Sequence, residues 1–243
     1  MTTTPSDRLP LAPETLERLG RVATATLATQ LFKLGFRSRW LHGLRPLSAR
    51  CRLVGEAVTV RFVPTREDLG TYEALADPGY PQRRAIEEIA PGQVLVLGCR
   101  GIPDAAAVGD ILIARLHVRG AAGVVADGGI RDYPVIRTLD FPVYALGPAA
   151  PAHVARHLAV DVDVPIGCAE VLVLPGDLMV GDEEGVICVP RGVAADVASR
   201  SVEQYRLEAF VLEKIRAGAP LPGTYPPSAA TRVEYEASRD RPP

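Results

Sequence analysis

Two short segments of the chain combine glycines with charged side chains in a way that could support catalysis. Residues 126–132 read Ala-Asp-Gly-Gly-Ile-Arg-Asp and follow a short apolar run. The guanidinium of Arg131 matches the geometry of a carboxylate, and Asp132 offers the hard oxygens that Mg²⁺ or Mn²⁺ prefers. The two glycines would let the backbone turn tightly and approach a ligand. The alternative is that Arg131 and Asp132 form an ordinary surface ion pair.

The second segment, residues 108–112, reads Val-Gly-Asp-Ile-Leu and lies where a helix is expected to begin. The first backbone N–H groups of a helix have no internal acceptor, so they readily bind an anion. Taken alone, this segment is better explained by Asp110 stabilising its own helix through the helix dipole. It gains interest only in combination with residues 126–132.

Other polar residues form weaker patterns. His153 and His157 are four residues apart and would share a helix face, but no acidic residue lies between them and no third ligand is evident. We therefore expect a polar helix face there. The acidic residues within 175–186 predict hairpin turns with solvated carboxylates. The four cysteines lack metal-site spacing and predict reduced, mostly buried thiols.

The apolar spacing predicts a mixed α/β fold. Helices are expected at residues 13–34, 82–89, 109–119, 134–139 and 193–217, and strands at 55–63, 94–97, 123–126, 142–145, 160–166, 170–174, 178–180 and 186–189. The alternation of strands and helices implies parallel pairing, whereas the short strands of the second half predict a β-meander or barrel-like layer. We expect one domain over residues 1–243, with a core at about 20–217, helical extensions at both ends and a C-terminal arm at 218–243.

The composition excludes several classes of function. The chain has 243 residues, a net charge of −2 and 5% aromatic residues, which argues against a nucleic-acid partner. Residues 1–8 are polar and no apolar stretch is long enough to span a membrane, so we expect a cytoplasmic protein. The sequence contains no G-x-G-x-x-G motif after an expected strand, so we expect no nucleotide cofactor. Lys33 and Lys214 lie far from the candidate segments, so an aldol-type reaction would need a metal rather than a Schiff base.

Residues 109–112 followed by 119–132 resemble the 4-hydroxy-4-methyl-2-oxoglutarate aldolase family, which also contains the regulator of ribonuclease E activity A. Supporting matches lie at residues 42–47, 54–61 and 175–186, and the resemblance covers about residues 20–217. It implies a swivelling β/β/α-type fold and a homotrimer or hexamer with active sites between subunits. Departures from the family pattern lie in the first helix, at residues 65–68 and 77–79, and in the longer tail.

The resemblance also implies roles for individual residues. Asp132 would bind Mg²⁺ or Mn²⁺ directly, with waters completing much of the metal shell. Asp110 would hold a metal-bound or catalytic water. Glu208 is the best match for an acidic residue of the C-terminal helix that approaches the metal of a neighbouring subunit through water.

The substrate side follows in the same way. Arg131 would hold the pyruvoyl end of a small 2-oxo acid at the turn that begins with Gly109, and the backbone N–H groups of Ile111 and Leu112 would take its carboxylate. The implied activity is that of a class II-type aldolase, which cleaves a 4-hydroxy-2-oxo acid to pyruvate and a second carbonyl product. Decarboxylation of oxaloacetate passes through the same enolate and is an expected side activity.

Several alternatives stay open. The substrate could be an acid from aromatic catabolism or a sugar-derived 2-keto-3-deoxy acid. The same enolate chemistry could serve a hydratase or dehydratase. A different class of function is a non-catalytic binding protein that, like the ribonuclease regulator of the family, masks the surface of a ribonuclease.

Overall fold

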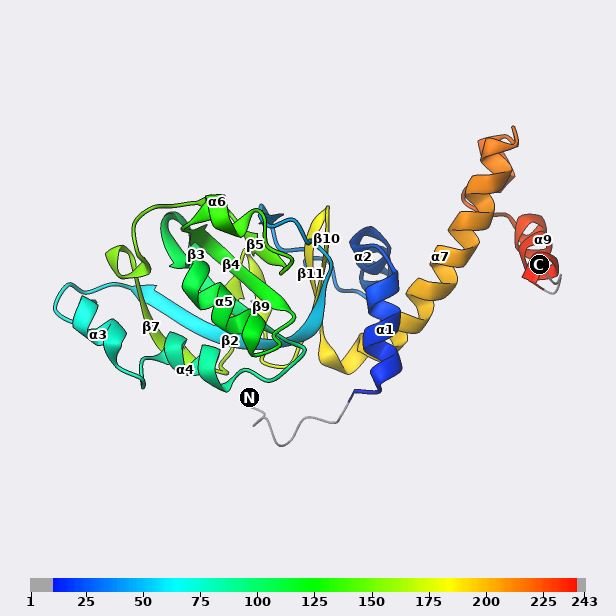
Figure 1. Ribbon diagram of the computed structural model, residues 1–243. Helices are drawn as coiled ribbons and strands as arrows, with labels where there is room; N and C mark the ends of the chain where they lie inside the picture. The colour runs from blue at the N-terminus through cyan, green and yellow to red at the C-terminus, as the bar shows by residue number, and fades with distance from the viewer. Residues whose placement is uncertain (1–10, 240–243) are drawn as a thin grey trace.

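The computed structural model describes residues 11–239, so the polar residues 1–8 lie outside the described part (Figure 1). The helices are α1 (Pro13–Arg21), α2 (Thr24–Lys33), α3 (Tyr72–Ala76), α4 (Pro81–Glu88), α5 (Asp110–Val118), α6 (Tyr133–Ile136), η2 (His153–Ala155), η3 (Arg191–Val193), α7 (Ala194–Arg216), α8 (Leu221–Thr224) and α9 (Ala229–Arg239). The strands are β1 (Arg45–Pro46), β2 (Leu53–Pro64), β3 (Gln93–Val108), β4 (Gly123–Ile130), β5 (Val143–Ala145), β6 (Gly147–Pro148), β7 (His157–Val162), β8 (Ile166–Cys168), β9 (Val171–Val173), β10 (Leu178–Asp182) and β11 (Gly185–Val189).

One large mixed sheet organises the molecule. Its strand order is β1-β5-β4-β3-β2-β10-β11, with β6 beside β4 and β7 beside β2. Strands β2, β3, β4 and β5 run parallel, whereas β1, β7, β10 and β11 pair in antiparallel fashion. The predicted mixed α/β fold is therefore confirmed. The barrel-like layer expected for the second half is part of this same sheet, because β7 and β10 both join β2 and β11 continues from β10 to contact β1, while β8 and β9 form a small second sheet.

The central strands are apolar throughout because both faces of the sheet are covered. Residues 94–99 of β3 are all buried, which is the pattern of a strand without a solvent face. On one face, Ile86 of α4 and Ile113 and Leu116 of α5 belong to the same apolar cluster as alternate residues of β3. Figure 1 shows α5 lying over β3 and β4. The β8–β9 hairpin belongs to the cluster on the other face.

The N-terminal helical extension is two helices rather than the single helix expected over residues 13–34. The chain is extended at Val22 and Ala23, between α1 and α2. The break is fixed by Asp182 at the end of β10, whose carboxylate accepts the backbone N–H of Thr24 at 2.7 Å and its hydroxyl at 2.8 Å. A buried carboxylate at the start of a helix satisfies donors that the helix itself leaves unpaired. Asp182 is thus buried, not solvated as expected.

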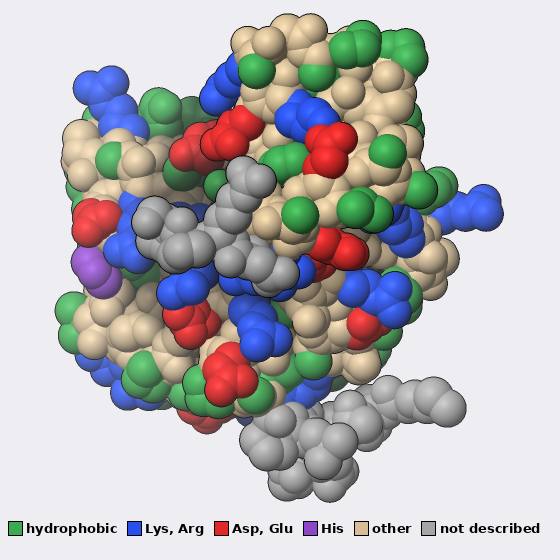
Figure 2. Space-filling view, turned by 90° about the vertical axis from the view of Figure 1, so that its right-hand side faces the viewer, with side chains coloured by type: hydrophobic (Ala, Val, Ile, Leu, Met, Phe, Trp, Pro, Cys, Tyr) green, Lys and Arg blue, Asp and Glu red, His purple; other side chains and the backbone are tan. Residues whose placement is uncertain are grey.

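The described C-terminal part consists largely of the helices α7, α8 and α9. Helix α7 packs against α1 and α2, and its second half extends away from the sheet (Figure 1). Within the arm expected over residues 218–243, the structure describes the helices α8 and α9 as far as Arg239. Figure 2 views this end of the molecule, where acidic and basic side chains are interspersed with hydrophobic ones. The exposed large hydrophobic residues of α7, α8 and α9 and their connections are Tyr205, Leu212, Leu221, Tyr225 and Val233.

The structure bears on two expectations, one about the cysteines and one about membrane-spanning segments. Cys51, Cys99, Cys168 and Cys188 are free thiols, and all but Cys51 are buried, as expected. Over residues 11–239, no helix combines the length and the apolar content that crossing a bilayer requires.

Candidate active site

The ends of β3 and β4 bring the two candidate segments together. The strands are parallel neighbours, with Val108 opposite Ile130, and the backbone N–H of Arg131 donates to the carbonyl of Val108 at 3.1 Å. Helix α5 connects the strands, so residues 109–112 leave the sheet beside residues 131–132. Ligand sites in α/β proteins favour this carboxyl edge of parallel strands.

Asp132 is held in an unusual conformation at this edge. Its backbone lies in the left-handed region, with φ 62° and ψ 32°. Its Oδ2 accepts from Nε of Arg131 at 3.2 Å and more weakly from the backbone N–H of Asp110 at 3.4 Å. A Cβ on Gly109 would lie 2.6 Å from the same oxygen. A glycine at position 109 therefore allows the carboxylate to occupy this place, and a strained residue of this kind is often functional.

The ion pair between Arg131 and Asp132 thus exists, but it faces a cavity rather than an open surface. The cavity has a volume of about 360 Å³, within the size range of small-molecule sites. Its lining includes every residue that the sequence assigned to one chain's share of the site, namely Gly109, Asp110, Ile111, Leu112, Arg131 and Asp132. The fold therefore brings these six residues to one place.

The start of α5 shows how the backbone donors are used. The N–H of Ile111 donates to Oδ1 of Asp110 at 2.7 Å, so Asp110 stabilises its own helix, as the simpler interpretation predicted. A substrate carboxylate at this amide would have to displace Oδ1. The N–H of Leu112 belongs to the first turn and has no acceptor within the helix. The side chain of Ile111 is 76% exposed, so its backbone, not its side chain, is the group that could recognise a ligand.

The oxygen atoms at the cavity fit a hard divalent cation in part. Asp110 and Asp132 supply carboxylates, and Mg²⁺ in proteins commonly uses one or two carboxylates together with waters. Within residues 11–239, no three His, Cys, Asp or Glu side chains are grouped closely enough to form a complete site. The donor set is therefore suited to Mg²⁺ or Mn²⁺ with a shell completed by water or by another chain.

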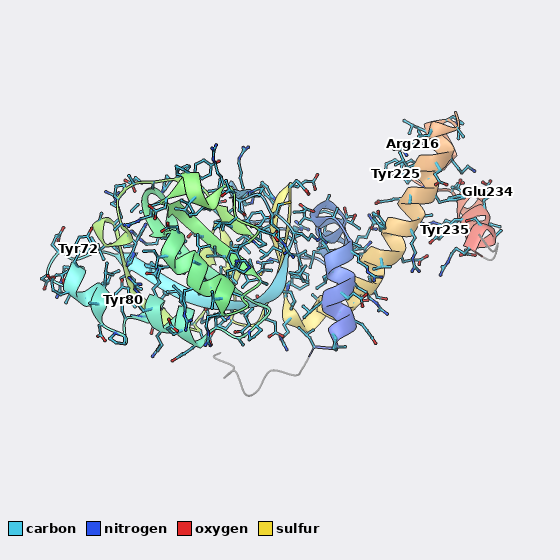
Figure 3. The ribbon with its side chains drawn as sticks, viewed as in Figure 1. Tyr72, Tyr80, Arg216, Tyr225, Glu234 and Tyr235 are labelled. Atoms are coloured by element: carbon cyan, nitrogen blue, oxygen red, sulfur yellow. The ribbon has the colours of Figure 1, made fainter. Side chains whose placement is uncertain are left out.

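Glu208 does not join this site within one chain. It lies on α7, where its Oε1 accepts from Nε2 of Gln204 at 2.7 Å, and Gln204 accepts in turn from Gln30 of α2. Figure 3 shows Tyr72, which lines the cavity, at the far end of the molecule from Arg216, the last residue of α7. A role for Glu208 needs a second copy of the chain and stays a prediction.

Three other polar residues line the cavity, and the sequence did not assign any of them to this site. They are Tyr72 of α3, Arg83 of α4 and His153 of η2. None belongs to a recognisable motif. The only sequence signal was indirect, because α3 lies between residues 65–68 and 77–79, the two stretches that depart from the family pattern.

The predicted polar helix face at His153 and His157 is wrong. His153 lies in η2 and His157 opens β7, and both side chains are buried. Burial lowers the pKa of His153 to about 4, so it is neutral at pH 7. The hydroxyl of Tyr80 lies 3.0 Å from its Nε2 and already accepts the N–H of Ala159.

Asp127 has a structural role behind the site. It is 3% exposed, and its carboxylate accepts backbone N–H groups from Cys99, Gly101 and Ala169, the last two at 3.0 Å. Burial outweighs these donors and raises its pKa to about 6. The contacts join β3 and β4 to the turn before β9.

The expected turn at residues 127–129 is instead part of β4. Gly129 is needed there for a close approach rather than for a turn. A Cβ at this position would lie 2.5 Å from Cβ of Ala149 and 2.6 Å from the carbonyl oxygen of Pro103. The turn occurs later, at Arg131 and Asp132.

Comparisons with known proteins place this site in context. Residues 24–188 match the family model described as RraA-like, Aldolase/RraA, and this range contains both candidate segments but not Glu208. A putative 4-hydroxy-4-methyl-2-oxoglutarate aldolase of Halalkalibacterium halodurans is 32% identical over 158 residues, which are 65% of this chain and 69% of that protein.

Two crystal structures share most of the fold. An uncharacterised protein of Pseudomonas syringae pv. tomato has a TM-score of 0.77 and 28% identity, covering 90% of this chain and 100% of that one. Streptomyces coelicolor RraAS2, an unusual member of the RNase ES inhibitor RraA protein family, has a TM-score of 0.74 and 32% identity, covering 84% of this chain and 98% of that one.

Proposed function

The chain belongs to the RraA-like family, and we propose on this basis that it is a divalent-metal-dependent aldolase. It would cleave a 4-hydroxy-2-oxo acid to pyruvate and a second carbonyl product. The observation that carries the proposal is the meeting of Arg131, Asp132 and the start of α5 in one cavity at the ends of β3 and β4. The name of the H. halodurans relative supports the same chemistry.

The cavity residues would divide the work as follows. Arg131 would donate to the oxygens at the 2-oxo end of the substrate and stabilise negative charge that develops there on cleavage. The substrate carboxylate would lie against the first turn of α5, where the N–H of Leu112 needs an acceptor. Asp110 uses Oδ1 to bind Ile111, and its Oδ2 would hold the water that takes the proton of the C4 hydroxyl.

A divalent metal fits this arrangement. Mg²⁺ or Mn²⁺ held by Asp132 would supply Lewis-acid polarisation of the 2-oxo group. Cleavage of the C3–C4 bond would leave the enolate of pyruvate, and Arg131 would stabilise its negative charge. Loss of carbon dioxide from oxaloacetate leaves the same enolate, so oxaloacetate decarboxylation is expected as a side activity.

Assembly is part of the proposal. The second half of α7 extends away from the cavity of its own chain, so Glu208 could reach the cavity of a neighbouring copy (Figure 1). We expect a homotrimer or a hexamer, with Glu208 acting on the metal through water. A second candidate function is inhibition of a ribonuclease, favoured by the likeness to S. coelicolor RraAS2.

The test is a pyruvate assay on the full chain with Mg²⁺ or Mn²⁺, a panel of 4-hydroxy-2-oxo acids, and oxaloacetate. Loss of residues that only support metal ligands costs about 10- to 100-fold, so Asp132→Ala should lower activity by more than about 100-fold. Asp140→Ala is the matched control, because Asp140 is exposed and lies outside the cavity. EDTA should abolish the activity.

Full activity in EDTA, or an unchanged Asp132→Ala enzyme, would refute the metal assignment. Inhibition of a ribonuclease without pyruvate from any acid in the panel would favour the second candidate function.

A further inference from the structure

A second cavity lies beside the β8–β9 hairpin. Its volume is about 670 Å³, within the size range of small-molecule sites, and none of its lining residues lines the cavity at Arg131 and Asp132. The parallel pairing of β2 with β3 ends at this second cavity, at Arg61 and Gly98. The ends of parallel strands are where ligands of α/β proteins commonly bind.

Two turns in the wall of the second cavity have a left-handed backbone at residues other than glycine. Arg100 of β3 has φ 65°, and Ala169 and Glu170, which connect β8 to β9, have φ 48° and 65°. A two-residue hairpin turn with positive φ at both positions normally contains Asn, Asp or Gly. Within residues 11–239, three of the five non-glycine residues with positive φ line this cavity, and a fourth is Asp132. Such costly conformations are concentrated at functional sites.

One buried carboxylate holds both turns. Asp127 accepts the N–H groups of Cys99 and Gly101, which flank Arg100 in the chain. Its Oδ2 also accepts the N–H of Ala169, in the hairpin turn, at 3.0 Å. The two turns are therefore fixed relative to each other by the fold itself. A site that is already arranged in this way loses less conformational freedom when a ligand binds.

The charged side chains that these turns carry have opposite signs, and neither has a partner of opposite charge. Arg100 donates from Nη2 to the carbonyl of Arg156 at 2.8 Å and lies 3.0 Å from Nδ1 of His157, and neither acceptor is a carboxylate. Glu170 is exposed, and its side chain forms no ion pair within residues 11–239. Both groups are available to a ligand.

The other charged groups around the second cavity already have partners. Asp161 pairs with Arg61 of the wall, and Asp104 pairs with Arg156 at 3.5 Å. His42 adds an exposed imidazole. The apolar part of the wall includes Leu146, Pro165 and Ile166. The second cavity thus combines an available guanidinium, an available carboxylate and an apolar surface.

We propose that the second cavity binds a small zwitterion of the α-amino acid class that has an apolar side chain. The carboxylate of the ligand pairs with the guanidinium fork of Arg100, and its ammonium group pairs with the carboxylate of Glu170. Its side chain packs against Leu146 and Ile166. A ligand with a single charge leaves one of the two protein groups without a partner and binds more weakly.

The test is calorimetric titration of the full chain with L-leucine and L-phenylalanine. Each amino acid is compared with two analogues, one that lacks the ammonium group (4-methylpentanoate or 3-phenylpropanoate) and one that lacks the carboxylate (3-methylbutylamine or 2-phenylethylamine). A hydrogen bond between charged groups changes affinity about 10- to 100-fold, so at least one amino acid should bind at least about 10-fold more tightly than both of its analogues. Binding of neither amino acid, or equal binding of the analogues, would overturn the proposal.

Two substitutions assign the charges. Glu170→Gln should weaken binding of the amino acid about 10- to 100-fold without affecting the analogue that lacks the ammonium group. Arg100→Gln should weaken it by a similar factor without affecting the analogue that lacks the carboxylate. Glu88→Gln and Arg84→Gln are the matched controls, because both residues are exposed on α4 and line neither cavity. Unchanged binding in Glu170→Gln or Arg100→Gln would refute the assigned contact.

Glu170→Gly separates binding from folding. Glycine adopts φ 65° without strain, so this variant should lose the same affinity as Glu170→Gln without a fall in melting temperature. Retained affinity would show that the side chain of Glu170 does not contact the ligand.

Asp132→Ala separates this proposal from the proposed aldolase activity. Because the two cavities share no lining residue, amino-acid binding should persist in this variant even though pyruvate formation is lost. Loss of binding in Asp132→Ala would place the amino acid in the candidate active site and overturn the proposal. Binding by a wild-type protein that releases no pyruvate from any acid would refute the aldolase and leave the second site standing.

Discussion

Gly109→Ala should separate the chemistry of the site from the stability of the fold. The backbone at Gly109 is extended, with φ −125° and ψ −179°, so alanine can adopt it without strain. Its Cβ, however, would lie 2.6 Å from Oδ2 of Asp132, whereas ordinary contact begins at 3.4 Å. The oxygen must therefore retreat by about 0.8 Å, and it can do so because it ends a flexible side chain.

The expected magnitudes follow from this displacement. A misplacement of about 1 Å can cost about 100-fold in rate, so kcat/KM for pyruvate release should fall about 10- to 100-fold. The affinity for Mn²⁺, measured by titration, should fall as well. Alanine is poorer than glycine before a helix but restricts the unfolded chain, and these effects of about 1 kcal/mol oppose each other. The melting temperature should therefore change by no more than about 4 °C.

Gly147→Ala provides the control for Gly109→Ala. Gly147 belongs to β6, next to β4, and a Cβ there would meet no atom within 4 Å. It should leave rate, metal affinity and melting temperature unchanged. Full activity and metal affinity in Gly109→Ala would mean that the position of Asp132 against Gly109 is irrelevant to function. A large fall in melting temperature would mean that the clash is relieved by the backbone instead.

Two further predictions concern the framework of the site. Gly129→Ala should lower the free energy of unfolding by about 1–3 kcal/mol, because its Cβ would meet the backbone oxygen of Pro103, which cannot move aside. Urea titration measures this change, and an unchanged unfolding midpoint would contradict the close packing at Gly129. His153 has its pKa lowered from 6.5 to about 4 by burial, so the stability it contributes is complete above pH 6.5 and is lost as the pH falls towards 4. The non-titrating His153→Gln variant should lose about 3 kcal/mol less than wild type over this range, and parallel pH profiles would refute the buried neutral state.

The sequence predicted the elements that local chemistry specifies. Residues 109–112 and 131–132 were placed at strand ends by their glycines and by the apolar runs before them, and the alternation of strands and helices implied that those ends would be neighbours. The parallel pairing of β3 and β4 makes them so. The apolar periodicity and the glycine-containing motifs were sufficient to predict this part of the site, because each depends on only a few neighbouring residues.

Features that depend on contacts between residues far apart in the chain could not be predicted from local sequence patterns. The break before Thr24 depends on Asp182, which lies on another element and is 158 residues away in the chain. His153 is buried because the chain before β7 folds over β2, and its spacing from His157 says nothing about that. Arg83 reaches the cavity only through the packing of α4 on the sheet.

The buried carboxylate of Asp127 has a consequence for how the protein opens. It receives N–H groups from two positions at the middle of β3 and from the turn between β8 and β9. Peeling the β8–β9 hairpin from the main sheet would remove the N–H donor of Ala169 from this carboxylate, which costs a charge-assisted hydrogen bond. We therefore expect the two sheets to open together, and we expect segments that Asp127 does not contact, such as the outer helices α8 and α9, to open before them.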